Sequence, residues 1–414
     1  MKAKNYTTAT LLLLGFMLYE APRASVAAEN ESEEASQVEI VVVTGVRVSQ
    51  DMVLEAREVA QPGVDNSDLL RLFPGGNRNA NGALTRISQY RGLFGAQNNV
   101  AIDGLGYAPD CPNWMDSPIS SIPQTMTESV TLFRGLGSVD AVAEGLGGAI
   151  AIESRSGTFG EDEQWRFYGN AQASYGSNAS SWNTSVYAGL RNHSNWLDAA
   201  ASKDKGDDYE FDGGVVRASQ YDRDQYRFGY GHRFTEAEFS IGAVINRTGP
   251  TGTPALPMDI RYIDSEQYQF TLDTPVGPGD MEFHFSTLSV DHVMDNFTSR
   301  PPPDNAMGKP NYRESAPFGD SQTFKLSYEW TRPAVTFRFG LDGNFDSHTA
   351  QITDPTNERF FIDNFNDVER DRAGAYAITT WAAGAWHWEA NFRFNRVRMD
   401  AGEVAGFLGM MNLQ

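Results

Sequence analysis

The sequence predicts a small α+β domain followed by an antiparallel β-barrel that crosses a membrane. Hydrophobic and polar residues alternate with a period of two from about residue 164 toward the end of the 414-residue chain. Short and long connections alternate between these segments. Beyond the N-terminus, no segment is both long and apolar enough for a transmembrane helix, so any membrane crossing has to be made by strands.

Composition and charge exclude some functions and leave the membrane prediction open. The 39 glycines and the aromatic content of 12% are typical of many short strands and turns. A net charge of -21 argues against a nucleic-acid partner, because a phosphate polyanion attracts the opposite charge. The mean hydropathy of -0.43 is compatible with a membrane barrel, since each strand shows lipid on one face and water on the other.

Residues 1–28 have the pattern of an export signal. Lys2 and Lys4 give a positive start, Thr10–Tyr19 is a short apolar run, and small residues at Val26–Ala28 supply a cleavage site. We therefore expect a signal peptide over residues 1–28.

Residues 29–50 are predicted to be a flexible segment that carries a short β-prone stretch. Glu29–Gln37 is acidic and cannot bury enough apolar surface to fold. Glu39–Gly45 (EIVVVTG) could add itself as a strand to the sheet of another protein. Taken in isolation, it could equally be the first strand of the next domain.

Residues 51–160 are predicted to be a compact α+β domain. Val64–Phe73 begins with capping residues, continues with a short helical pattern and meets a stop at Pro74–Gly76. The strands are expected at Val100–Ile102, within Ile122–Phe133 after a short helix, and at Gly147–Glu153.

Residues 161–414 are predicted to form barrel strands with one lipid-facing and one lumen-facing side. An arginine beside a glutamate on an inward face, as at Glu389 and Arg393, does not suit a small packed core and suits a watery lumen. About eleven such strands are predicted. In one of them Val335, Phe337, Phe339 and Leu341 share the lipid face, and Thr336, Arg338, Gly340 and Asp342 the lumen face.

The predicted connections alternate in length, as in barrels that have tight periplasmic turns and large outer loops. A soluble β-sandwich does not need this alternation. The first connection, Gly176–Ser180, is short and departs from the trend. The other short connections are Arg191–Asn195, Phe234–Glu238, Thr274–Asp280 and Thr331–Ala334, and the long ones are Lys203–Gln225, Asn246–Pro257, Asp295–Ser321 and Asp346–Arg372.

These motifs resemble TonB-dependent outer-membrane receptors. Glu39–Gly45 looks like a TonB-box, and Asn99–Gly106, Ser129–Gly145 and Leu146–Gly157 look like the successive motifs of the plug domain. The resemblance implies a plug inside a barrel of about 22 strands, in the outer membrane of a Gram-negative bacterium, with lipid and lipopolysaccharide around it. It also implies TonB as the partner that supplies energy. The TonB contacts would be Glu39, Ile40, Val41, Val42, Val43 and Thr44.

The prediction departs from the family in the number of strands. About eleven strands are half of a barrel, and the free edges of a half barrel are costly in lipid. The terminal segment Met410–Gln414 lacks the aromatic residue with which family members usually end. We therefore expect the chain to hold about half of the barrel.

Cys111 and Met115 are a candidate pair of soft metal ligands. Cys111 is the only cysteine, so it cannot form an internal disulfide, and a thioether follows four residues later. Sulfur ligands select copper(I), or less sharply zinc. The alternative is an inert buried cysteine beside a packing methionine.

His292 and Met294 are a second candidate pair. At positions i and i+2 of a strand they share one face, and they come just before a long outer loop. Glu282, His284 and Ser286 indicate that this face looks into the lumen, whereas Leu288 and Val290 argue against it.

Together the two pairs resemble the pattern of the copper-binding outer-membrane receptors typified by OprC and NosA. That resemblance implies that Cys111, Met115, His292 and Met294 bind a copper ion, as cargo rather than as a catalytic group. Met258 and Met307, in outer loops, are candidate secondary contacts or simple packing residues.

Three functions follow as hypotheses. The first is TonB-dependent uptake of copper; the second is a receptor for a metal chelate such as a siderophore, with Cys111 structural. The third is a surface binding or signalling protein that transports nothing. No paired carboxylates, nucleophile elbow or phosphate-binding glycine loop stands in a context that predicts an enzyme.

Overall fold

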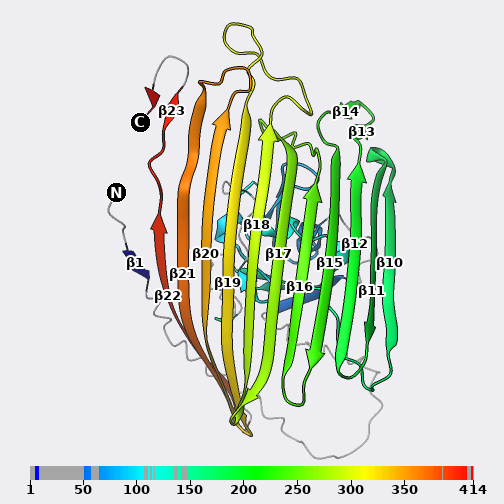
Figure 1. Ribbon diagram of the computed structural model, residues 1–414, viewed down its shortest axis with the longest axis vertical. Coiled ribbons are helices and arrows are strands. Elements are labelled where there is room, and N and C mark those ends of the chain that lie inside the picture. The colour runs from blue at the N-terminus through cyan, green and yellow to red at the C-terminus, as the bar shows by residue number, and fades with distance from the viewer. Residues whose placement is uncertain are drawn as a thin grey trace, which may run out of the picture.

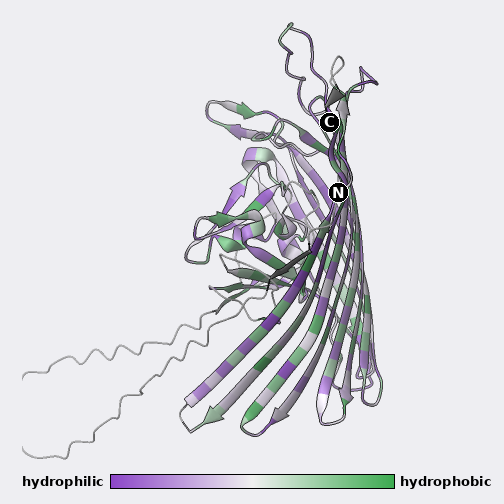
Figure 2. Ribbon diagram, turned by 90° about the vertical axis from the view of Figure 1, so that its left-hand side faces the viewer, coloured by the Kyte–Doolittle hydropathy of each residue, from purple (hydrophilic) through white to green (hydrophobic). Residues whose placement is uncertain are grey.

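The computed structural model describes residues 5–8, 51–56, 65–106, 111, 114–115, 117–134, 139–140, 148–384, 386–407 and 412–413. The predicted TonB contacts Glu39–Thr44 lie outside the described residues. A small mixed domain packs against one face of a large curved sheet (Figure 1). Figure 2 shows this arrangement from the side.

The small domain contains two sheets and a short helix. A five-stranded sheet has the order β2-β8-β9-β6-β7, in which only β6 and β9 run parallel. A second sheet has the order β3-β4-β5. The bounds are β2 Asp51–Glu55, β3 Gly76–Ala80, β4 Arg86–Tyr90, β5 Leu93–Phe94, β6 Asn99–Ile102, β7 Leu105–Gly106, β8 Thr127–Phe133, β9 Ala149–Ser154, and the 3-10 turns Gly95–Gln97, Pro118–Ser120 and Gln124–Met126.

The predicted helix is shorter than its sequence pattern. Helix α1 spans Ser67–Leu70, and two further turn hydrogen bonds extend the helical turns to Phe73. The chain then reverses closely enough that a Cβ on Gly76 would lie 2.1 Å from the carbonyl oxygen of Leu70. The predicted stop is therefore confirmed, and it depends on glycine at position 76.

Apolar side chains from α1 and one face of the five-stranded sheet form the core of this domain. Val130, Leu132, Ile150 and Ile152 are all fully buried. They come from the neighbouring strands β8 and β9, where cross-strand packing stabilises a sheet most directly.

The large sheet contains eleven long strands in the part of the chain that the structure describes, as predicted. They lie in chain order and all are antiparallel to their neighbours. Short β1 (Asn5–Thr8) pairs with β22 at one edge, and β13 (Tyr209–Phe211) pairs with β14 (Gly214–Val216) in an outer hairpin. The bounds are β10 Arg166–Gly176, β11 Ser181–Arg191, β12 Asn195–Gly206, β15 Tyr221–Arg233, β16 Glu238–Thr248, β17 Asp259–Val276, β18 Gly279–Asp295, β19 Glu314–Arg332, β20 Val335–Thr353, β21 Phe361–Ala383 and β22 Trp386–Asp400, with short β23 Gly406–Phe407 and β24 Asn412–Leu413 beyond.

The two predicted faces of the large sheet are confirmed. Phe339 and Leu341 are 47% and 52% exposed on the outer face. Arg338 and Arg393, on the other face, bond to the small domain at Asp140 and Val139. No helix among the described residues is long and apolar enough to cross a membrane.

The short connections are confirmed, but three of the long ones were predicted too long. The connection between β12 and β15 covers residues 207–220, the loop between β18 and β19 covers 296–313, and the one between β20 and β21 covers only 354–360. The strands continue past the end of the hydrophobic alternation because backbone pairing needs no lipid face. With about 9–11 residues enough to cross a bilayer, the polar upper parts of these strands extend beyond it.

Candidate metal centre

Strand β18 places His292 and Met294 on the face that contacts the small domain. Its pairing with β19 keeps one register, and the irregularity in its pairing with β17 lies on the β17 side, between Ile260 and Tyr262. The even-numbered face therefore stays the inner face along its length. Ser286, Leu288, Val290, His292 and Met294 are all at most 5% exposed.

This arrangement confirms the predicted face and explains the two residues that argued against it. Leu288 and Val290 lie on the same inner face as His292. They are buried by the small domain and the outer loops rather than by lipid. An apolar residue on a lumen face is therefore no sign of a reversed register where a plug covers the wall.

Met115 and Met294 belong to one apolar cluster. Met115, from the small domain, packs against a group of buried side chains on β17 and β18 that includes Met294. The structure thus brings together the two thioethers predicted as ligands. The buried members of this cluster are Ile260, Ile263, Leu288, Val290 and Met294.

Cys111 and His292 are both buried beside their methionine partners in the chain. Cys111 is 1% exposed, and a tight turn, in which Trp114 donates its backbone N–H to the Cys111 carbonyl at 2.9 Å, leads to Met115. His292 is 0% exposed, two residues before Met294. The roles of the four residues as metal ligands stay predictions.

The two loop methionines differ. Met258 packs against the same cluster from the loop between β16 and β17. Met307 is 78% exposed in the loop between β18 and β19. The structure therefore adds Met258 to the candidate centre and leaves Met307 in solvent.

The outer loops close over this cluster through ion pairs. Arg300 bonds to the Asp259 carboxylate at 2.9 Å and to the carbonyl of Leu256 at 2.7 Å. Asp259 also accepts the backbone N–H of Thr253 at 2.8 Å. Two loops and the start of β17 are thereby joined above the methionines.

A second link joins the next pair of loops. Arg313 bonds to Asp354 at 2.9 Å, and its guanidinium lies 3.8 Å from the centre of the Phe360 ring. Burial opposes ionisation of Asp354, but hydrogen bonds from Thr356 together with Arg313 outweigh it and lower the pKa of Asp354 below its ordinary value. This carboxylate therefore stabilises the folded loops while it is ionised.

A cavity of about 580 Å³ lies between the small domain and the wall, near the short-turn end of the strands. Its carboxylates are Asp103 and Glu153 from the small domain, and Glu238, Asp273 and Glu282 from β16, β17 and β18. Burial, followed by the nearby Asp103 carboxylate, raises the pKa of Glu153 to about 7. His284 lines the same cavity.

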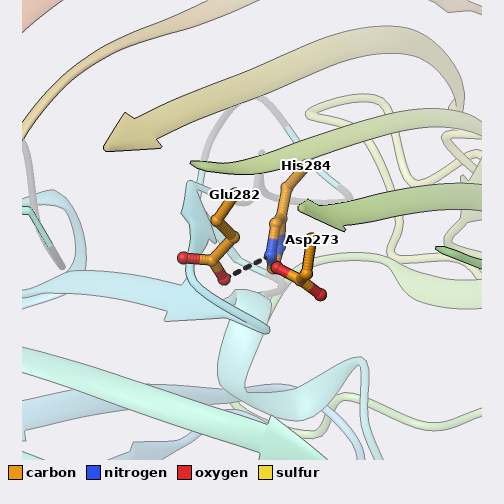
Figure 3. A group of neighbouring side chains, drawn as sticks. All are labelled: Asp273, Glu282 and His284. Atoms are coloured by element: carbon orange, nitrogen blue, oxygen red, sulfur yellow. Dashed lines mark ion pairs between the residues drawn. The ribbon is translucent and has the colours of Figure 1, made fainter. Parts of the chain in front are cut away.

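Three of these side chains point toward one another (Figure 3). Asp273 and Glu282 are direct cross-strand partners, and His284 follows Glu282 by two residues on the same face. Their ligand atoms all lie within 4.8 Å of one another. Sequence reasoning used Glu282 and His284 only to assign the strand face; the Glu-x-His spacing was the available signal, but Asp273 required the register.

Buried polar contacts fix the small domain to the wall. Arg223 on β15 bonds to the carbonyl of Ser120 at 2.7 Å and to Asp204 on β12 at 2.7 Å. Arg393 on β22 bonds to the carbonyl of Val139 at 2.5 Å. The contacts come from strands that are far apart in the sheet, so the domain is held to the wall at two separate places.

Comparison with known proteins identifies this arrangement. Residues 46–149 match the TonB-dependent receptor plug domain. The chain has the fold of a TonB-dependent receptor. The small domain is its plug, and the large sheet is its barrel wall. No curated protein matches the sequence.

Solved structures share the fold of this chain at low sequence identity. "Copper transporter OprC" superposes with a TM-score of 0.78 at 22% identity, over 88% of this chain and 58% of that one. The FrpB iron transporter of Neisseria meningitidis gives 0.64 at 12% identity, over 85% and 59%. The Serratia marcescens hemophore receptor HasR, solved with its hemophore HasA and heme, gives 0.65 at 16% identity, over 84% and 52%. This chain thus spans a little over half the length of those chains.

Proposed function

We propose that the receptor takes up copper across the outer membrane, with Cys111, Met115, His292 and Met294 as the ligands of the incoming ion. The observation that carries the proposal is the packing of Met115, from the plug, against the wall cluster that contains Met294. Two thioethers predicted from separate motifs, in segments far apart in the chain, are thus members of one cluster.

The chemistry of the four residues suits copper(I). A thiolate, two thioethers and an imidazole are a soft donor set, and such sets select copper(I) over harder cations. The surrounding side chains are apolar, which excludes water and favours binding of an ion that sheds its hydration. Met258 would supply a fifth ligand, and a fourth sulfur, at the edge of the centre.

Transport would require the plug to move relative to the wall. TonB would draw on Glu39–Thr44 in the periplasm, separate Met115 from Met294 and so divide the donor set between plug and wall. An ion left with half of its ligands binds more weakly, and release would follow. In this proposal TonB is the partner protein that supplies energy, and lipid and lipopolysaccharide surround the barrel.

The likeness to OprC supports copper, but other receptors with this fold are an iron transporter and a hemophore receptor. A receptor for a metal chelate therefore stays the alternative. It predicts that the purified protein ignores free copper(I) and binds a bulky ligand through its outer loops.

The test is a competition titration of copper(I) against a chromogenic chelator, with metal content measured by mass spectrometry. The chain with its natural sequence should hold one copper ion. Cys111→Ala and the double variant Met115→Leu, Met294→Leu should each lose it, because leucine keeps the volume and removes the sulfur. Met307→Leu is the matched control, since Met307 is exposed in a loop. Equal copper affinity in all four proteins would refute the ligand assignment.

A further inference from the structure

We propose that Asp273, Glu282 and His284 form a binding site for a borderline divalent cation, Cu²⁺ or Zn²⁺, at the periplasmic end of the lumen. The three side chains converge from the hairpin of β17 and β18 on one point (Figure 3). The site is separate from the sulfur cluster, which lies near the opposite end of β18, and the inference does not depend on copper uptake.

The sheet register brings like charges together here. Glu238, Asp273 and Glu282 are successive cross-strand partners on β16, β17 and β18. Carboxylates directly opposite each other on a sheet repel and destabilise it. Glu238 is compensated by Arg233 at 2.6 Å, and Glu282 by His284, whose Nε2 lies 2.6 Å from its Oε1.

Of these three carboxylates, only that of Asp273 lacks such a compensating side chain among the described residues. None of the described residues gives its carboxylate a hydrogen bond or an ion pair. Lys325, the cross-strand partner of His284, offsets part of the negative charge from the β19 side. A cation between Asp273, Glu282 and His284 would relieve the remaining repulsion.

The donor set and its surroundings fit a transition metal. Two carboxylates and one imidazole, with positions open to water, are the ligand types of zinc and copper(II) sites. Ser327 donates a hydrogen bond to the second oxygen of Glu282 at 3.1 Å and so orients the carboxylate. The cavity of about 580 Å³ gives an ion access and leaves room for water ligands.

The plug supplies further oxygen donors to the same space. Glu153 lines the cavity opposite His284, and Asp103 lies beside it. Asp103 is already engaged, because it accepts the backbone N–H of Ser154 at 2.7 Å. Glu153 is therefore the plug residue best placed to complete the coordination.

The experiment is a Cu²⁺ titration followed by electron paramagnetic resonance, on detergent-purified chain carrying Cys111→Ala. That background lacks the thiolate of the sulfur centre, so the readout does not depend on copper uptake. We expect about one Cu²⁺ per chain, with hyperfine coupling to a single imidazole nitrogen. His284→Ala should abolish this coupling and weaken binding about tenfold or more.

One further variant and one control decide the outcome. Asp273→Asn keeps the side-chain shape, and should weaken binding while the nitrogen coupling stays. His387→Ala should change nothing, because His387 is an exposed histidine at the same end of the wall. Absence of bound Cu²⁺, coupling that survives in His284→Ala, or coupling lost in His387→Ala would overturn the proposal.

Discussion

Arg223→Ala should release the plug from the wall locally while the wall stays folded. The Arg223 and Asp204 side chains are only 2% and 3% exposed, and they share hydrogen bonds of 3.0 and 2.7 Å. Alanine would leave the Asp204 carboxylate buried without its guanidinium and the Ser120 carbonyl without its donor. Removing one partner of a buried ion pair costs about 3–5 kcal/mol, so we expect a loss of that size in the free energy of plug opening.

Native-state hydrogen exchange measures this free energy directly. Ser120 also exchanges hydrogen bonds with the backbone of Arg86 on β4, so amides of β4 report on its release. At tenfold for each 1.4 kcal/mol, their protection should fall by about a hundredfold to several thousandfold.

Two matched variants test the reasoning. Arg247 on neighbouring β16 pairs with Glu266 at 2.5 Å, but the two side chains are 38% and 42% exposed. Arg247→Ala should therefore cost about 0–1 kcal/mol. The double variant Arg223→Met, Asp204→Leu should restore most of the protection, because an apolar pair replaces the buried charges. If Arg223→Ala changed protection no more than Arg247→Ala does, the reasoning would be wrong.

Three further predictions concern energy coupling, pH and the plug turn. Deletion of Glu39–Thr44 should abolish copper uptake in cells and leave copper affinity unchanged, and equal uptake would favour the signalling hypothesis. Because the pKa of Asp354 is lowered in the folded protein, its contribution to stability is complete above about pH 4 and is lost as the pH falls through the folded-state pKa. Hydrogen exchange of loop 354–360 should therefore accelerate below pH 4. In Arg313→Ala the same acceleration should begin at a higher pH. Gly76→Ala should destabilise the plug by several kcal/mol in urea unfolding, because its Cβ would lie 2.1 Å from the Leu70 carbonyl oxygen; a loss under about 1 kcal/mol would contradict this.

Much of the barrel wall was predictable because lipid imposes a period of two. Phe339 and Arg338 occupy the faces that their alternation predicts. The upper strand ends were not predictable in the same way. From Ser347 on β20 and up to Glu369 on β21, backbone pairing continues without a regular hydrophobic alternation in the sequence to mark it.

The residues of the two candidate metal centres also differ in whether the sequence could predict them. Cys111, Met115, His292 and Met294 stand out because sulfur and imidazole at short spacings are visible in the sequence. Asp273 does not, since only the pairing of β17 with β18 brings it opposite Glu282. A site that depends on register between strands is not readable from spacing within one strand.

The inner face of β18 has a consequence for leakage across the outer membrane. His284 and His292 are eight positions apart, which is about 27 Å along an antiparallel strand. Between them lie Leu288, Val290 and one hydroxyl, Ser286, that already accepts a hydrogen bond from Gln267 at 3.0 Å. An ion that entered this stretch would lose its hydration and gain no ligand in return. This stretch of the inner face of β18 therefore opposes the passage of an ion between the two ends of the strand while its side chains stay dry.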